Sequence, residues 1–315
     1  MIVLTGGKTG GHIVPLLAIA EQLDSICYVG AKNSLEERLC VQRKIQFVGL
    51  HLDSHHIVQI LKAYREIKLT NVTAILSTGG YVSAPMLLYG IVHRIPIYLL
   101  EENVIMGRTN RIFSCFAKKV FLTYPLPKMK KKYEVVGLPL SQKLKPLNHI
   151  FQFDILIIGG SLGSKPLCEL SSVLNKKYKI CLIAGKYESD YKHLNQVVTL
   201  SYADDLIELM KRAKLVISRA GASTTYELFT YRRPCILIPS KKTKQNHQYL
   251  NALYFEEKGC CKLLKEDEAK DRILLLVNQM LNDQQLILNM QTAQQKIVKT
   301  DSTTKIIEQI QEKKQ

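Results

Sequence analysis

Residues 2–12 read IVLTGGKTGGH, an apolar β-branched run that passes directly into a turn containing four glycines. A helical run from Ile13 to Leu23 follows, and Pro15 fits there if it lies in the first turn of the helix. Glycines let backbone amides approach an anion, and the helix N-terminus contributes about half a positive charge. We therefore predict a phosphate site in this turn, the alternative being a turn that only packs the helix tightly on the strand.

The rest of the first half repeats this alternation of buried strands and helices. Further apolar runs are Ile26–Val29, Ala74–Leu76, Ile97–Leu100 and Val120–Leu122. Such an alternation predicts a parallel sheet with helices on both faces, a Rossmann-like domain, over residues 1–140. Proline, asparagine and lysines interrupt the pattern in the predicted linker, residues 141–150. Residues 151–315 are predicted to form a second Rossmann-like domain. Its C-terminal helix either stays with this domain or packs back on the first domain. We predict an α/β protein whose two parallel sheets face each other across a cleft.

Two further glycine turns support this plan. The run Ile155–Ile158 leads into residues 159–164 and then into a helix with Pro166 near its start, as in the first half. A turn at residues 79–80 is expected at the same sheet edge as the first turn. Open α/β sheets bind ligands at the carboxyl ends of their strands, so each domain is predicted to hold an anion. None of the turns has the spacing of a Walker A or G-x-G-x-x-G motif, which weakens ATPase and NAD-dependent interpretations.

Three side chains near these turns are candidates for chemistry or capping. Residues 219–227 read RAGASTTYE, so Glu227 lies early in a helix, where it either accepts hydrogen bonds from ribose hydroxyls or only complements the helix dipole. His12 has a side chain suited to a general base or a substrate hydrogen bond, although histidines at this position also cap helices. Asp205, with Asp204 before it, is predicted to cap a helix and not to bind a metal.

Composition excludes several classes of protein. An apolar fraction of 46% without low-complexity tracts is typical of globular chains. No signal peptide is expected, and no apolar run approaches the roughly 18–20 residues that span a membrane. The eight cysteines include no C-x-x-C pair, so we expect reduced thiols and no metal site. The net charge of +17 favours a polyanion or an anionic membrane surface as a partner. No nucleic-acid-binding motif is present, so nucleic acid is not expected.

Six short motifs occur in order along nearly the entire chain. They are Thr9-Gly10-Gly11-His12, Gly79-Gly80-Tyr81-Val82-Ser83, Glu101-Glu102-Asn103, Gly159-Gly160-Ser161, Arg219-Ala220-Gly221 and Gln248-Tyr249-Leu250-Asn251-Ala252. In this order and spacing they resemble the MurG family of peptidoglycan N-acetylglucosaminyltransferases, which are GT-B glycosyltransferases. Each motif alone is weak, whereas the set across two domains is specific.

The resemblance implies transfer, with inversion, of N-acetylglucosamine from UDP-N-acetylglucosamine to the 4-hydroxyl of the muramyl sugar of undecaprenyl-linked lipid I. The product, lipid II, serves peptidoglycan synthesis, and the scheme needs no metal or other cofactor. We take His12 as the base that deprotonates the attacking hydroxyl. Carried over by position, Glu227 is implied to bind the ribose, Ala203 to lie beside the uracil, and Asn103 and Gln248 to contact the N-acetylglucosamine. The uridine and diphosphate are implied to be held by Ser161, Ala222, Ser223, Thr224, Thr225 and Tyr226. Thr9, Gly10 and Gly11 are implied to close over the phosphates by a hinge motion about residues 138–149.

Three positions depart from the family pattern. Ser141 stands where many relatives carry arginine, Leu138 stands where many carry asparagine before the proline, and Leu100 replaces a common histidine. A phosphate-facing guanidinium is therefore missing, and Lys8 or Lys165 is the candidate to restore its charge, although lysine lacks the bidentate fork of arginine.

A lipid-linked acceptor implies a peripheral protein on the cytoplasmic side of the inner membrane. The segment Ile57–Leu69 combines apolar residues with Lys62, Arg65 and Lys68, and residues 128–132 add cationic density. These segments are predicted to contact the anionic membrane surface, the alternative being an ordinary helix that faces the core.

Two other functions remain open from the sequence. One is a GT-B glycolipid synthase that transfers glucose or galactose to diacylglycerol. The other is a nonenzymatic module that binds nucleotides or nucleic acid, which the charge favours and the motifs do not.

Overall fold

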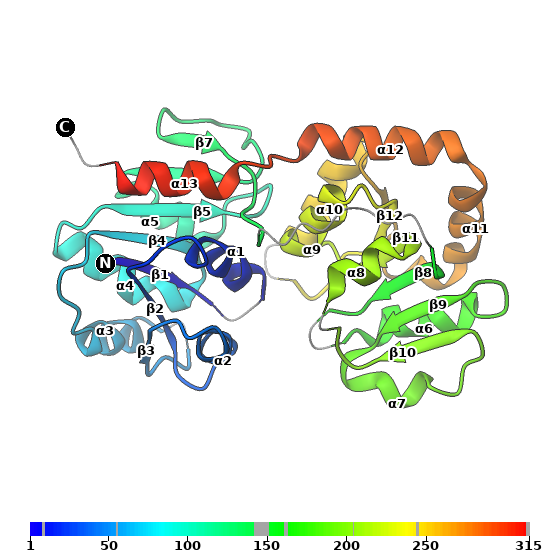
Figure 1. Ribbon diagram of the computed structural model, residues 1–315, viewed down its shortest axis with the longest axis horizontal. Coiled ribbons are helices and arrows are strands. Elements are labelled where there is room, and N and C mark those ends of the chain that lie inside the picture. Colours follow the sequence, from blue (N-terminus) through cyan, green and yellow to red (C-terminus); the bar gives the residue numbers. More distant parts are fainter. Residues whose placement is uncertain are drawn as a thin grey trace. The chain divides into compact units, whose positions relative to one another are not determined.

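The computed structural model describes residues 1–7, 10–54, 56–141, 151–160, 163–203, 205–243 and 246–312. The chain divides into two compact α/β units (Figure 1). Unit 1 comprises residues 1–144 and 299–315, and unit 2 comprises residues 145–298. The C-terminal segment therefore belongs to unit 1 although it follows unit 2 in the chain. Of the predicted linker only Ser141 lies within the described residues, so the predicted hinge falls largely outside them.

Unit 1 is built on a seven-stranded sheet of order β3-β2-β1-β4-β5-β6-β7, in which every strand pair is parallel. Its strands are β1 (Ile2–Gly6), β2 (Ile26–Ala31), β3 (Phe47–Leu50), β4 (Ala74–Gly79), β5 (Ile97–Glu101), β6 (Lys119–Leu122) and β7 (Tyr133–Val135). Its helices are α1 (Gly10–Ala20), α2 (Leu35–Gln42), α3 (Ile57–Glu66), η1 (Tyr81–Ser83), α4 (Ala84–Val92), α5 (Arg108–Phe113) and α13 (Ser302–Gln311). The five strands predicted in this half are present; β3 and β7, which are short and mostly half-buried, were not predicted.

Alternate residues of these strands enter two cores on opposite faces of the sheet. One core joins Leu4, Tyr28 and their neighbours to α1, α2 and α13. The other joins the intervening residues, such as Val3 and Ile75, to α3 and α4. On the first face the phenol of Tyr98 in β5 donates a 3.1 Å hydrogen bond to the carbonyl of Gln309 in α13. Helix α13 is thus an integral part of unit 1.

Unit 2 has a six-stranded parallel sheet of order β10-β9-β8-β11-β12-β13. Its strands are β8 (Phe153–Ile158), β9 (Ile180–Ile183), β10 (Val197–Leu200), β11 (Ala213–Ser218), β12 (Cys235–Leu237) and β13 (Lys262–Leu263). Its helices are α6 (Lys165–Leu174), η2 (Gly185–Tyr187), α7 (Glu188–Tyr191), α8 (Leu206–Lys211), α9 (Ala222–Thr230), α10 (His247–Glu257), α11 (Ala269–Asn282) and α12 (Gln284–Ile297). The prediction of two parallel α/β domains is confirmed.

The first helix begins earlier than the sequence suggested. Helix α1 starts at Gly10, so Pro15 lies in its interior, and the prediction that this proline occupies the first turn is wrong. The apolar periodicity starts only at Ile13, because glycines carry no side chain that could reveal the helix before it. His12 consequently lies in the first turn of α1 and not on the preceding loop.

Candidate active site

In unit 1 two glycine turns meet at the carboxyl ends of the neighbouring strands β1 and β4. Gly6 of the first turn is the register partner of Gly79 in the second. Gly79 and Gly80 have φ angles of 90° and 77°, a region that costs glycine little and other residues more. A Cβ atom on Gly6 would collide with the hydroxyl of Thr78, which donates a 2.7 Å hydrogen bond to the carbonyl of His12. The turns therefore hold the backbone of His12 against the sheet edge.

The ring of His12 faces a buried carboxylate. Its Nδ1 lies 3.4 Å from Oε2 of Glu102, whose side chain is 2% exposed, whereas that of His12 is 27% exposed. Burial lowers the pKa of His12, but the carboxylates of Glu102 and Glu101 together raise the pKa above its ordinary value. Burial in turn raises the pKa of Glu102, despite the opposing effect of the imidazole. The site therefore presents a partly exposed histidine whose protonated form is stabilised by a buried carboxylate.

Asn103, the predicted sugar contact of unit 1, is held by the adjacent carboxylate. Its backbone N–H and its side-chain amide each donate a 3.1 Å hydrogen bond to Oε1 of Glu101. The second oxygen of Glu101 accepts 2.9 Å hydrogen bonds from the Gly107 N–H and the Asn110 amide. Glu101 thereby shapes the loop that carries Glu102 and Asn103 towards the ends of the strands.

In unit 2 the loops after β8 and β9 pack tightly against each other at the carboxyl edge. Gly160 and Gly163 have φ angles of 82° and 75°. A Cβ atom on Gly163 would collide with the carbonyl of Ala184, so this position requires glycine for its conformation and for space. Ser161, the predicted diphosphate contact, and Thr9 of unit 1 lie outside the described residues.

Arg219 ties three of the unit 2 loops together, a role that the sequence did not reveal. Its guanidinium donates a 2.7 Å hydrogen bond to the hydroxyl of Ser164 and a 3.0 Å hydrogen bond to the carbonyl of Ile238. It also forms an ion pair with Glu266. The loops after β8, β11 and β12 are therefore linked by one planar cation.

Helix α9 brings its first turn to the same edge of unit 2. Ala222 is its first residue, and the side chains of Ser223 and Thr224 are half-buried. Thr225 and Tyr226 are buried, so their side chains face the core and only their backbone is suited to meet a ligand. Early helical N–H groups without intrahelical acceptors are suited to bind an anion, as the sequence predicts.

Glu227 is a half-buried carboxylate on α9. Burial raises its pKa to about 7, and within the described part of the chain no cation or hydrogen-bond donor offsets that effect. An ionised carboxylate without a partner in such a place lowers the stability of the fold, and hydrogen bonds from the hydroxyl groups of a ligand would stabilise its charge. It is thus suited to a ligand with two neighbouring hydroxyl groups.

We expect Glu227→Gln to stabilise the protein at pH 8 and to have a much smaller effect at pH 5. The folded-state pKa lies above the unfolded value, so the native state loses stability as the pH rises from about 4.5 to 7. The glutamine removes this cost, which we place at about 2–3 kcal/mol at pH 8. Denaturant unfolding at both pH values measures it, with exposed Glu257→Gln as the control. An equal effect of Glu227→Gln at the two pH values contradicts the prediction.

The remaining predicted residues of unit 2 also lie at its carboxyl edge. Ala203 is half-buried in the loop after β10. Oε1 of Gln248 accepts a 2.9 Å hydrogen bond from the Ser240 N–H, which holds the loop after β12. Asp205 accepts a 2.9 Å hydrogen bond from the Glu208 N–H, so its predicted capping role is confirmed. Asp204 lies outside the described residues.

The structure describes only one of the two lysines proposed to replace the missing arginine. Lys165 is exposed at the first residue of α6, and Lys8 lies outside the described residues. Ser141 donates a 2.7 Å hydrogen bond to the carboxylate of Glu21. Across the described ranges, no group of three or more His, Cys, Asp or Glu side chains is arranged to hold a metal ion.

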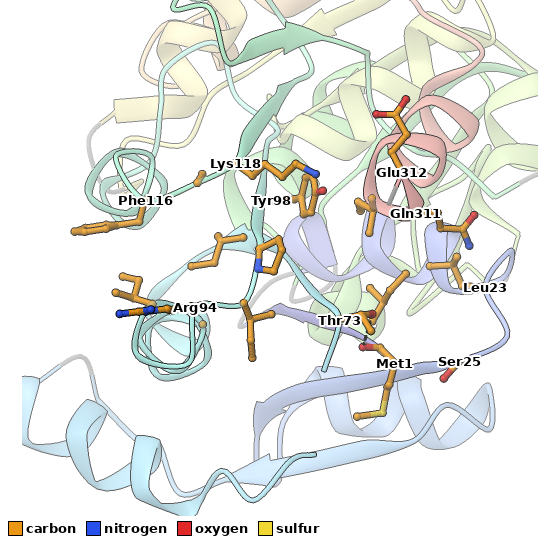
Figure 2. Close-up of a pocket in the computed structure, with 18 of the residues that line it drawn as sticks. Met1, Leu23, Ser25, Thr73, Arg94, Tyr98, Phe116, Lys118, Gln311 and Glu312 are labelled. Carbon is orange, nitrogen blue, oxygen red and sulfur yellow. Dashed lines mark hydrogen bonds between the residues drawn. The ribbon is translucent and has the colours of Figure 1, made fainter. Parts of the chain in front are cut away.

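Unit 1 contains a hollow of about 1040 Å³, and Figure 2 shows the residues that line it. Met1, Thr73 and Lys118 immediately precede β1, β4 and β6, which places this hollow at the amino ends of the strands. Gln311 and Glu312 at the end of α13 complete its wall. None of the predicted site residues that the structure describes lines it, so it is separate from the His12 edge.

Comparison with known proteins decides the family. Residues 2–122 match the glycosyltransferase family 28 N-terminal domain, and residues 154–310 match the family 28 C-terminal domain. The chain is 31% identical to the UDP-N-acetylglucosamine--N-acetylmuramyl-(pentapeptide) pyrophosphoryl-undecaprenol N-acetylglucosamine transferase of Sulfurihydrogenibium sp., over 87% of each chain. It is 30% identical to the transferase of the same name from Natranaerobius thermophilus, over 97% of each chain. The chain belongs to glycosyltransferase family 28, in the MurG group.

Solved structures agree with this membership. The crystal structure of Acinetobacter baumannii MurG superposes with a TM-score of 0.81 at 27% identity, covering 98% of both chains. The calicheamicin glycosyltransferase CalG4, at 12% identity and a TM-score of 0.72, shares the fold. The family 28 C-terminal model extends through most of α13, the helix that packs on unit 1 in this chain. This family 28 member is therefore a glycosyltransferase with the GT-B arrangement of two parallel α/β domains.

Proposed function

We propose that the protein transfers N-acetylglucosamine from UDP-N-acetylglucosamine to the 4-hydroxyl of the muramyl sugar of undecaprenyl-linked lipid I, forming lipid II. The observation that carries the proposal is alignment along 97% of the chain with a transferase whose name specifies this donor and acceptor. The placement of His12 and Glu227 at the carboxyl ends of parallel strands supports it, since that edge is where α/β sheets bind ligands. The reaction contributes to peptidoglycan synthesis.

Unit 2 is the donor domain in this proposal. The carboxylate of Glu227 accepts hydrogen bonds from both ribose hydroxyls, and Ala203 lies beside the uracil. The diphosphate meets the first turn of α9 and the glycine turn after β8, where backbone N–H groups and the helix dipole favour negative charge. The same groups stabilise the departing UDP as its charge develops. Gln248, with Oε1 occupied by Ser240, presents its amide nitrogen to the sugar.

Unit 1 is the acceptor domain and supplies the base. His12 takes the proton of the attacking 4-hydroxyl while that oxygen bonds to the anomeric carbon from the face opposite UDP, which gives inversion. Gly10 and Gly11 begin α1 beside His12 and leave room for the donor phosphates. Asn103, oriented by Glu101, contributes to the sugar site.

A radiolabel assay tests this function. Purified protein with UDP-[14C]N-acetylglucosamine and a short-chain lipid I analogue should form labelled disaccharide lipid. Equal turnover with UDP-glucose and diacylglycerol instead identifies a glycolipid synthase. Tight RNA binding at physiological salt, with no increase in Tm on adding UDP-N-acetylglucosamine, identifies a binding module.

We also propose that α3 carries unit 1 onto the cytoplasmic face of an anionic membrane, where the acceptor is anchored. Ala63 of the helix and Ile67 directly after it are buried, whereas Ile57, Val58 and Leu61 are 72%, 60% and 46% exposed. Lys62, Arg65 and Lys68 are exposed alongside them. Apolar side chains flanked by lysine and arginine are typical of surfaces that insert shallowly into anionic lipid. No helix in the described segments is long and apolar enough to cross a bilayer.

We expect the double substitution Ile57→Asp/Leu61→Asp to reduce partitioning onto vesicles containing anionic phospholipid by at least about tenfold. Each buried apolar side chain contributes roughly 1.5–3 kcal/mol, and the added charges repel the lipid. Vesicle co-sedimentation measures the effect. The matched control is Leu275→Asp/Leu288→Asp, which changes two apolar residues of unit 2 that are 73% and 55% exposed. Equal loss of binding in both variants rules out α3 as the contact surface.

A further inference from the structure

Two consecutive glutamates at the end of β5 are both buried, at 2% exposure, but their surroundings differ. Glu101 accepts four hydrogen bonds, from Asn103, Gly107 and Asn110, and acts as a structural tie. Among the described residues, the polar group that faces Glu102 is Nδ1 of His12, which lies 3.4 Å from its Oε2. Within the described residues its Oε1 has no hydrogen-bond partner. Buried carboxylates are rarely left in this condition unless a function requires it.

His12 is oriented towards this carboxylate from the other side. Its Nδ1 is buried and, among the described residues, has no partner at ordinary hydrogen-bond distance, since Oε2 of Glu102 lies 3.4 Å away. Its backbone is fixed by the Thr78 hydroxyl, and its ring lies beside Gly80, where a Cβ atom would stand 3.7 Å from the ring carbon Cδ2. The side chain is nevertheless 27% exposed, which leaves Nε2 as the nitrogen that can meet a substrate.

We propose that Glu102 is a positioning residue that keeps the proton of neutral His12 on Nδ1, so that the lone pair of Nε2 faces the acceptor hydroxyl. This inference rests on the proposed function for its consequence in catalysis. During transfer, Nε2 takes the hydroxyl proton as the new carbon–oxygen bond forms and the bond from the anomeric carbon to the UDP oxygen breaks. The imidazolium then stands beside the Glu102 carboxylate, which stabilises its charge and stays ionised, and the proton passes to solvent.

Other charged groups around His12 do not take this role. Glu101 also raises the pKa of His12, but both of its oxygens are occupied by amide donors. Tyr28 in β2 donates its hydroxyl hydrogen bond to the carbonyl of Gly6. Glu36 in α2 accepts a 3.3 Å hydrogen bond from the Ala31 N–H and lies against the glycine turn. Glu102 is thus the carboxylate that faces the imidazole directly.

The test begins with Glu102→Gln, which keeps the shape of the side chain and removes its charge. NMR titration of the His12 ring, assigned by the signal lost in His12→Ala, should show a lower pKa than in the wild type, because the imidazolium loses its partner. The matched control is Glu66→Gln, which removes the carboxylate facing His51 at 3.1 Å elsewhere in unit 1 and should leave the His12 titration unchanged. An unchanged His12 pKa in folded Glu102→Gln overturns the proposal, and this readout does not depend on transferase activity.

Kinetics supply the second readout. Glu102→Gln should lower kcat roughly 10–100-fold at unchanged KM for the UDP-sugar and shift the acid limb of the kcat–pH profile to lower pH. In a His12→Ala background the same substitution should cost almost nothing, since Glu102 acts through His12. Additive losses in the double variant overturn the proposal. If Glu102→Gln does not fold, Glu102→Asp, which keeps the charge at a greater distance, should give a smaller decrease in the His12 pKa; no decrease counts against the proposal.

Discussion

Replacement of His12 by alanine is expected to reduce kcat for transfer to lipid I by about 10²–10⁴-fold, the usual contribution of a positioned general base. The affinity for UDP-N-acetylglucosamine should stay within about twofold, because the proposed nucleotide contacts lie in unit 2. The ring that is lost is the proposed acceptor for the proton of the attacking hydroxyl. Steady-state kinetics with a lipid I analogue, together with calorimetric donor binding, separate the two quantities.

The control for this variant is His51→Ala. His51 is an exposed histidine of the same unit, paired with Glu66 at 3.1 Å and distant in sequence from the glycine turns. It should retain wild-type turnover. Turnover of His12→Ala within a few fold of the wild type removes His12 from the role of base, and a loss of donor affinity equal to the loss in kcat assigns it to binding.

Glu227→Ala is expected to weaken binding of UDP-N-acetylglucosamine by at least roughly a hundredfold. Hydrogen bonds to a charged acceptor contribute about 1.5–3 kcal/mol each, and the proposal gives the carboxylate two of them. Because burial raises the pKa of Glu227 to about 7, wild-type affinity should increase as the pH rises from 6 to 8 and the carboxylate ionises. The alanine variant should lack this dependence, which calorimetry at the two pH values measures.

A nucleotide lacking one hydroxyl sharpens this test. The wild type should bind UDP more tightly than 2′-deoxy-UDP, whereas Glu227→Ala should bind the two alike, since it lacks the acceptor for either hydroxyl. The control Glu257→Ala, at an exposed carboxylate of α10, should discriminate as the wild type does. Discrimination that persists in Glu227→Ala assigns the ribose contact to another residue.

Strand prediction succeeded where side chains are buried on both faces of a sheet. The continuous apolar runs of β1, β4 and β8 can be read directly from the chain, because parallel strands covered by helices exclude polar residues. The edge strands β3 and β7 were not predicted, because their side chains are mostly half-buried and do not form a continuous apolar run. The start of α1 was predicted too late for a related reason, since Gly10 and Gly11 have no side chains that contribute to the apolar periodicity of a helix.

The candidate site divides in the same way. His12 and Glu227 could be selected from the sequence because each follows a predicted strand and a glycine turn. Glu102 and Arg219 were visible only as members of motifs. Their roles depend on contacts across 90 and 55 residues of chain, from Glu102 to His12 and from Arg219 to Ser164. At such separations along the chain, the sequence does not show which residues lie close together in the folded protein.

The glycine turn after residues 2–5 by itself determined the class of fold and the edge at which chemistry is expected, because strand burial, helix start and anion binding are local consequences of residue type. Tertiary structure alone decided which groups face each other there. It placed α13, the last helix of the chain, on the sheet of unit 1, and it buried Glu102 beside Nδ1 of His12. The physical reason is that the pKa of a histidine depends on burial and on neighbouring charge, and both arise only when distant segments pack together.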